Sequence, residues 1–99
     1  MFDWRQVSGF DWDGGNFRKS DIKHGVSNVE AEQIFFNRPL LIVTDTKQSQ
    51  KEPRCHALGK TDSDRLLHIS FTLRAKGTLI RIISARDMHR KERVCYDKA

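Results

Sequence analysis

Two basic segments, far apart in the chain, contain the side chains best suited to chemistry on a phosphodiester. Lys23 and His24 stand at a glycine break between two helical patterns. Arg81 lies inside an apolar run, and Arg86 lies near the end of that run. Guanidinium groups match the geometry of phosphate oxygens, and histidine titrates near neutral pH. These residue types predict one site that grips a phosphodiester and either cleaves it or only holds it.

Both segments also have ordinary structural explanations. Arg81 shares a predicted strand face with Leu79 and Ile83. It is therefore either one half of an ion pair with a helix carboxylate or a guanidinium aimed at a phosphate. His24 is either a general acid or base, or a histidine that caps the C-terminal end of a helix. Residue types alone do not distinguish a catalyst from a basic binding module or a purely structural cluster.

Metal-free cleavage of RNA would use these residue types in defined roles. The ribose 2′-hydroxyl must lose a proton before it attacks its own phosphate, and a histidine or lysine can accept that proton. Arginines stabilise the charge of the pentacoordinate transition state, and an acid protonates the leaving 5′-oxygen. We expect no metal and no other cofactor, because Cys55 and His56 point to opposite faces of a strand and no metal-ligand spacing accompanies them.

The positive charge is concentrated in the C-terminal half. The 99-residue chain has a net charge of +5 at pH 7. Residues 1–50 contain six Lys and Arg against seven Asp and Glu, whereas residues 51–99 contain twelve against six. A basic half favours an anionic partner such as a nucleic acid or an acidic protein, although many small basic domains merely have a solvated surface.

Length and composition predict one small domain that spans residues 1–99. With 37% apolar and 31% charged residues, the core is modest and the surface is highly charged. No stretch approaches the ~20 apolar residues of a membrane helix, and the N-terminus has no apolar signal segment. Cys55 and Cys95 are too few for a disulfide framework, so a reducing cytoplasm is expected.

Helical signals dominate the N-terminal part. A short aromatic strand is expected first, then a helix over residues 13–23 that Gly25 ends. Ser27 and Glu30 form a capping box for a second helix that runs to about residue 37. The side chains expected to bury that helix are Val29, Gln33, Ile34, Phe35 and Phe36.

Strand signals dominate the following part. Alternating apolar and polar residues predict a meander of four strands, the last of which is expected to be buried on both faces. The predicted strands are residues 40–45, 54–60, 65–73 and 78–85.

A second helix cap follows the last strand. Ser84 and Asp87 would open a charged helix that ends near Tyr96, which would put Arg86 in its first turn. The order of elements predicts an α+β fold, in which N-terminal helices pack on a four-stranded or slightly larger antiparallel sheet with a C-terminal helix.

An ordered series of short segments spans the chain from about residue 10 to residue 96. They are Phe10–Asp13, Lys23–Ser27, Glu30–Ala31, Phe35–Phe36, Arg54, Ala57–Gly59, Arg65–Leu67, Ile80–Arg86, Glu92–Arg93 and Tyr96. In this order they resemble the BrnT toxin family, the ribonuclease half of BrnT–BrnA type II toxin–antitoxin systems.

The resemblance implies a RelE-like fold whose concave sheet face holds the site. It implies a bacterial cytoplasmic endoribonuclease that cleaves RNA and inhibits translation. It also implies a BrnA-like antitoxin that blocks the toxin and binds operator DNA, with no role for a membrane. Carried over by position, the catalytic residues would be Lys23, His24, Arg54, Arg81 and Arg86, and the RNA-binding residues would be Arg65, His68, Glu92 and Tyr96.

Two positions depart from the family pattern. An aromatic residue is common where Cys55 stands, and an acid is common where Pro53 stands. If that aromatic stacks on a base, Cys55 weakens RNA binding in this chain. The alternative function is a non-catalytic basic module that acts with an antitoxin as an operator-DNA co-repressor.

Overall fold

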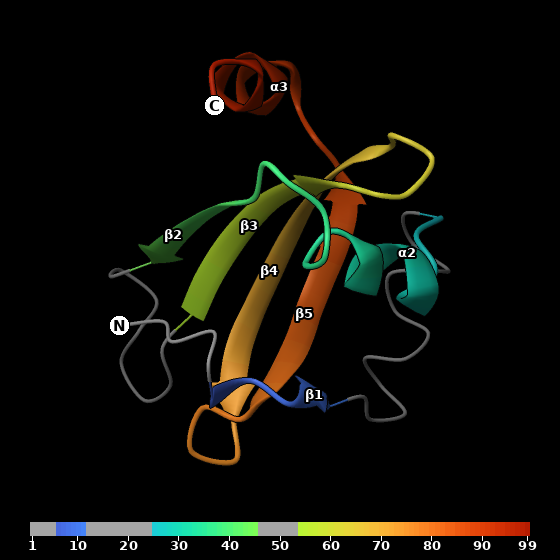
Figure 1. The fold of residues 1–99 in the computed structure, drawn as a ribbon. Coiled ribbons are helices and arrows are strands. Elements are labelled where there is room, and N and C mark those ends of the chain that lie inside the picture. Colours follow the sequence, from blue (N-terminus) through green and yellow to red (C-terminus); the bar gives the residue numbers. More distant parts are fainter. Residues whose placement is uncertain (1–5, 12–24, 46–53) are drawn as a thin grey trace.

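A five-stranded sheet organises the computed structural model, which describes residues 6–11, 25–45 and 54–99 (Figure 1). The expected helix over residues 13–23, with Lys23 and His24, lies outside these ranges. The elements are β1 Gly9–Phe10, α2 Asn28–Gln33, β2 Leu41–Asp45, β3 Arg54–Lys60, β4 Leu66–Arg74, β5 Leu79–Asp87 and α3 Arg90–Asp97.

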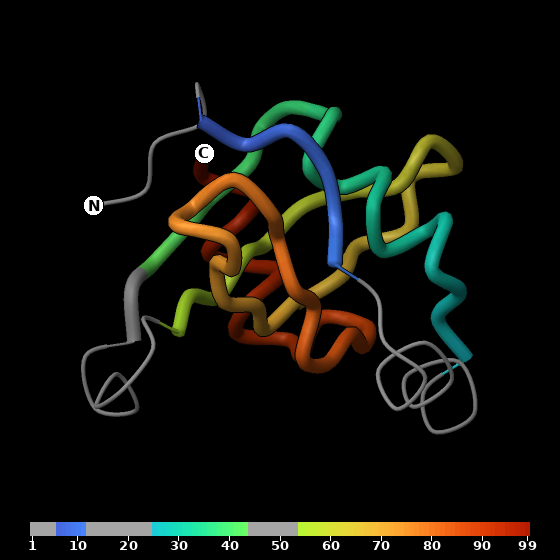
Figure 2. Tube along the Cα trace, turned by 90° about the horizontal axis from the view of Figure 1, so that it is seen from below, coloured from blue at the N-terminus to red at the C-terminus, as the bar shows by residue number. Residues whose placement is uncertain are grey.

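The strand order is β1-β5-β4-β3-β2, and the predicted meander of β2 to β5 is antiparallel throughout. β1 adds a fifth strand that runs parallel to β5, with Gly9 opposite Leu79 and Phe10 opposite Ile80. Figure 2 views the molecule from the end that carries the β4–β5 hairpin loop and shows β1 crossing beside β5. The α+β class is therefore confirmed, but the sheet is mixed rather than purely antiparallel.

The hydrophobic core lies on one face of this sheet. Leu67, Ile69 and Phe71 alternate along β4 and are fully buried, as the period-2 pattern predicts. Phe35, which follows α2, meets Phe71 edge to face with ring centroids 5.3 Å apart. Within the described part of the chain, no helix has the length and apolar character needed to cross a membrane.

Helix α2 begins as predicted and ends earlier than predicted. Ser27 Oγ accepts the Glu30 N–H at 3.1 Å, and the Glu30 carboxylate accepts the Ser27 N–H at 3.2 Å, which confirms the capping box. The helix stops at Gln33, and the chain then turns rather than remaining helical to residue 37. Val29 and Phe36 are 64% and 74% exposed, so their expected burial is wrong. The expected burial of Ile34 and Phe35 is confirmed, and Ala31 is buried with them.

The predicted start of the C-terminal helix is also wrong. Ser84 and Asp87 belong to β5, where they lie opposite Ser70 and Leu67 of β4. The sheet partner satisfies the backbone there, so no helix cap is needed. α3 begins instead at Arg90, after an N-cap at His89 whose N–H donates to Glu92 at 2.8 Å. Arg86 is therefore a strand residue.

Candidate functional site

A single-residue bulge in β5 puts the two predicted arginines on one face of the sheet. Along a regular strand, Arg81 and Arg86 would point to opposite faces, because they are five positions apart and successive side chains alternate between the faces. The pairing steps from Ile82 opposite Phe71 to Ser84 opposite Ser70, which leaves Ile83 as an extra residue. Ile83 therefore does not share the regular face of Arg81, contrary to the sequence-based prediction.

The face opposite the core consists of three rows of cross-strand neighbours. The strand registers place each row across β3, β4 and β5, about 4.8 Å apart from strand to strand. The rows are Arg54–Thr72–Arg81, His56–Ser70–Ser84 and Leu58–His68–Arg86. On the core side of β5, Ile80, Ile82 and Ala85 are fully buried, whereas the residues of β5 on the polar face are only partly buried. The expectation that β5 is buried on both faces is therefore wrong.

The first row places two arginines on either side of a small polar residue. Arg54 and Arg81 both lie opposite Thr72, so their backbones are two strand spacings apart, or about 10 Å. Thr72 itself is buried. Two guanidinium groups on long side chains can reach across this span toward one phosphate group between them. The first row is therefore the part of the face best suited to hold a phosphodiester.

Arg86, in the third row, is held by α3. Its two terminal nitrogens donate to the two carboxylate oxygens of Glu92 at 2.8 and 2.9 Å, a bidentate pair. The hydrogen bonds from Arg86, together with the His89 N–H, lower the pKa of Glu92 to about 2 against the opposing effect of burial. Glu92 therefore remains ionised and holds α3 over the third row at the end of the sheet away from the hairpin (Figure 1).

The middle of this face carries two histidines. The rings of His56 and His68 have centroids 5.1 Å apart, and His56 Nδ1 is 3.1 Å from Ser70 Oγ. Burial, reinforced by the nearby charge of Arg86, lowers the pKa of His68 to about 4 despite the opposing charge of Glu92. His68 is therefore neutral at pH 7, and its Nε2 lies 3.8 Å from Glu92, beyond hydrogen-bond distance.

One ring nitrogen of His68, Nδ1, is buried without a hydrogen-bond partner among the described residues. Leaving such a group unsatisfied costs about 1–3 kcal/mol, so native structures seldom retain one without a reason. A ligand or a bound water that reached this nitrogen would remove that cost.

Arg65, predicted to bind RNA, forms a network on another part of the molecule. Its guanidinium donates to Asp87 at 2.8 Å, to Glu30 at 3.1 Å and to the Gly25 carbonyl at 2.9 Å. Hydrogen bonds to Asp87 raise the pKa of Arg65. The network ties the start of α2 to the ends of β4 and β5, which gives Arg65 a structural explanation.

Tyr96 is likewise used within the fold. It is buried, and its hydroxyl donates to the Pro39 carbonyl at 2.7 Å, which ties α3 to the segment before β2. Burial raises the pKa of this phenol. The structure thus brings Arg54, Arg81, Arg86, His68 and Glu92 onto one face and directs Arg65 and Tyr96 to contacts elsewhere.

Five residues of this face were not among the predicted site residues, namely His56, Leu58, Ser70, Thr72 and Ser84. His56, Ser70 and Thr72 occupy its centre. Their alternation along two strands was visible in the sequence, and combining it with the register between those strands would have grouped them with Arg54.

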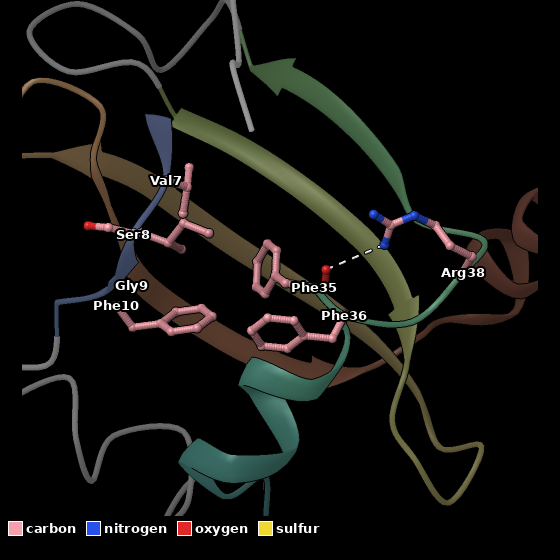
Figure 3. A pocket seen from close by; sticks show the side chains of 8 residues that line it. Val7, Ser8, Gly9, Phe10, Phe35, Phe36 and Arg38 are labelled. Atoms are coloured by element: carbon pink, nitrogen blue, oxygen red, sulfur yellow. Dashed lines mark hydrogen bonds between the residues drawn. The ribbon is translucent and has the colours of Figure 1, made fainter. Parts of the chain in front are cut away.

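A separate pocket of about 310 Å³ opens beside β1 and the segment after α2 (Figure 3). Phe10, Phe35 and Phe36 form an edge-to-face cluster there, with Phe10 to Phe35 centroids 5.7 Å apart. Arg38 lies at its rim and donates to the Phe35 carbonyl at 3.4 Å. None of the residues that line it belongs to the predicted site.

Comparison with known proteins identifies the family. Residues 12–92 match the family described as ribonuclease toxin, BrnT, of type II toxin–antitoxin systems. No curated protein matches the chain. The matched range covers most of the chain and includes all three rows of the polar face. Such a family implies an antitoxin partner. The chain therefore belongs to the BrnT family of ribonuclease toxins.

Proposed function

We propose that this chain is a metal-independent endoribonuclease with a RelE-like fold that acts in the cytoplasm. It cleaves RNA by promoting attack of a ribose 2′-hydroxyl of the RNA on the adjacent phosphate. Cleavage inhibits translation until a BrnA-like antitoxin neutralises the toxin. The observation that carries this proposal is the row Arg54–Thr72–Arg81, which presents two arginines on the face opposite the core. Membership of a ribonuclease toxin family makes RNA the expected phosphodiester.

In this proposal the arginines stabilise charge and other groups move protons. Arg54 and Arg81 hold the phosphate and stabilise the pentacoordinate transition state, which is typically the largest electrostatic contribution. Lys23 and His24 supply the proton steps, with one accepting the 2′-hydroxyl proton and the other protonating the leaving 5′-oxygen.

Arg86 and His68 act at the other end of the same face. Glu92 fixes Arg86 by the bidentate pair, so Arg86 contributes a positioned cation for the RNA backbone. His68, neutral at pH 7, contributes a hydrogen-bonding ring rather than a charge. For Arg65 and Tyr96, the structural contacts support a role in stability more than in RNA binding.

The test is cleavage of RNA by the purified protein in the presence of EDTA. Removal of one preorganised donor from a transition state typically costs about 10²–10³-fold in rate, so Arg81→Ala should cut cleavage by that factor. Arg90→Ala is the matched control. Arg90 is exposed in the first turn of α3, where a cation opposes the helix dipole, so its removal should leave both cleavage and stability unchanged.

The result also separates this proposal from the alternatives. Absence of cleavage by the wild-type protein, with retained and salt-sensitive binding to an antitoxin–operator complex, would favour the non-catalytic co-repressor. Equal cleavage by Arg81→Ala and Arg90→Ala would exclude Arg81 from the catalytic site. A lower melting temperature of Arg81→Ala, with the same loss of cleavage in a core variant of equal stability, would show that Arg81 is structural. Toxicity on expression, relieved by Arg81→Ala and retained by Arg90→Ala, is the expected result in cells.

A further inference from the structure

A pocket of about 270 Å³ lies between α3 and the polar face of the sheet. Leu41 and Val43 of the edge strand β2, Leu58 of β3 and Cys95 of α3 form its apolar walls. Its volume is just below the ~300–1,000 Å³ of typical small-molecule pockets, which suits one planar heterocycle. Tyr96 is the residue of α3 that is buried, so the helix leaves this space open beside it.

The polar groups of the pocket are those that recognise a nucleobase. His56 and His68 line it with neighbouring rings, and Glu92 lines its α3 side. Single-stranded RNA is recognised mainly by stacking of bases on aromatic rings, histidine included, and by hydrogen bonds to base edges. The unsatisfied nitrogen of His68 belongs to this same group of residues.

The pocket and the arginine row share one face. His56 is two residues along β3 from Arg54, and Leu58 is four, which corresponds to about 7 and 13 Å along the strand. A nucleotide with its phosphate between Arg54 and Arg81 would therefore have this pocket within reach of an adjacent base.

We propose that the pocket between α3 and the sheet is a nucleobase subsite, in which one base of the RNA inserts against the imidazoles of His56 and His68. The proposal rests on RNA being the substrate of the arginine row, and it adds a place where the chain contacts a base rather than the backbone. The ring pair and its position beside that row favour a base over an apolar side chain of a protein partner.

The experiment compares binding of two fluorescein-labelled 2′-O-methyl RNA octamers. One has a mixed sequence, and the other has the same backbone with every base removed. Neither can be cleaved through a 2′-hydroxyl, so binding is read independently of catalysis. Cys95→Phe and Val43→Phe fill the pocket from α3 and from β2, at positions that are exposed, with Val43 65% exposed. Val94→Phe, at the exposed neighbour of Cys95 that does not line the pocket, is the matched control.

Wild type and Val94→Phe should bind the octamer that carries bases more tightly than the abasic octamer. Each pocket-filling variant should lose about 5- to 150-fold in affinity for the octamer with bases and keep its affinity for the abasic one. Arg81→Ala should weaken binding of both. Melting curves establish that each variant is folded, and either filling variant alone is sufficient if the other unfolds.

Equal affinity of the wild type for both octamers would overturn the subsite, and so would wild-type affinities in a folded pocket-filling variant. Loss of antitoxin binding in the filled variants with unchanged RNA binding would assign the pocket to the protein partner and overturn it as well. Cleavage of ordinary RNA is measured in parallel. If the wild type does not cleave but the base-dependent affinity disappears on filling the pocket, the subsite stands and the catalytic proposal fails.

Discussion

Replacing Glu92 with glutamine should lower the free energy of unfolding by about 2 kcal/mol at pH 7. Through the Glu92 side chain, α3 is bound to Arg86 on the polar face of the sheet. Its carboxylate bonds both terminal nitrogens of Arg86 and also accepts the His89 N–H. Glutamine keeps the size of the side chain and an oxygen for His89, but it loses the charge that pairs with Arg86.

The magnitude follows from burial and from the pKa of the carboxyl. The side chains of Arg86 and Glu92 are 26% and 23% exposed, which lies between a fully buried pair and a solvated one. The pKa of Glu92 falls from 4.5 to about 2, which at 1.36 kcal/mol per pKa unit sets a ceiling of about 3 kcal/mol. Because glutamine retains the bond to His89, about 2 kcal/mol should be lost, equivalent to ~8–16 °C in melting temperature.

The effect should depend on pH in a defined direction. Above pH 4.5 the carboxyl of Glu92 is ionised in both the folded and the unfolded chain, so its contribution is complete. As the pH falls from 4.5 toward 2, the unfolded chain binds the proton first, and the contribution is lost. Urea unfolding at pH 7, 4 and 3 should therefore show the difference between wild type and Glu92→Gln shrinking toward zero.

Asp64→Asn is the control for this prediction. Asp64 pairs with Lys60 at 3.9 Å with its side chain 83% exposed, so the same change of charge should cost less than ~0.5 kcal/mol. Equal losses for Glu92→Gln and Asp64→Asn at pH 7 would refute the reasoning, because the Arg86–Glu92 pair would then behave as a solvent-screened surface pair.

Three further predictions concern stability. The free energy of unfolding of the wild type should fall by about 3 kcal/mol between pH 6.5 and pH 4, because the unfolded chain protonates His68 below pH 6.5 while the folded chain keeps it neutral to about pH 4. His68→Gln should flatten that part of the profile of stability against pH, and an unchanged slope would contradict the prediction. Gly59→Ala should lower the free energy of unfolding by about 1–3 kcal/mol, because the added methyl group would lie 2.9 Å from Ile34 Cβ and 3.2 Å from the Ile34 carbonyl oxygen. Chemical unfolding measures the difference, and a stability equal to that of the wild type would disprove this contact. Ser27→Ala should lower the unfolding free energy by about 1 kcal/mol through loss of the α2 cap, whereas Ser27→Asp should restore most of it, and a neutral Ser27→Ala would argue against the capping box.

The pattern of strands was predictable because alternation is a local property. β3 occupies residues 54–60 as expected, and the stripe Leu67, Ile69 and Phe71 is the core of β4. The α2 cap was predictable for the same reason, since Ser27 and Glu30 bond each other within one helical turn. Each of these features depends on residues close together in the sequence.

The helix boundaries were less predictable because nonlocal partners compete with local signals. Ser84 and Asp87 have the spacing of a cap, but pairing with β4 extends β5 through both residues. The apolar run after Ser27 favours a longer helix, but the early turn buries Phe35 against Phe71 and leaves Phe36 exposed. Tertiary contacts decided both cases over the local preference.

By itself, the sequence determined the class of the fold, the core face of the meander, the cap of α2 and the family to which the chain belongs. Only the tertiary structure decided which cations share a surface. The bulge at Ile83 brings Arg81 and Arg86 to one side of β5, and the strand registers add Arg54. Isoleucine and leucine occupy both faces of β5, so the alternation in the sequence contains no sign of the extra residue. Only the pairing with β4 reveals it, because a bulge is a relation between two strands rather than a property of one.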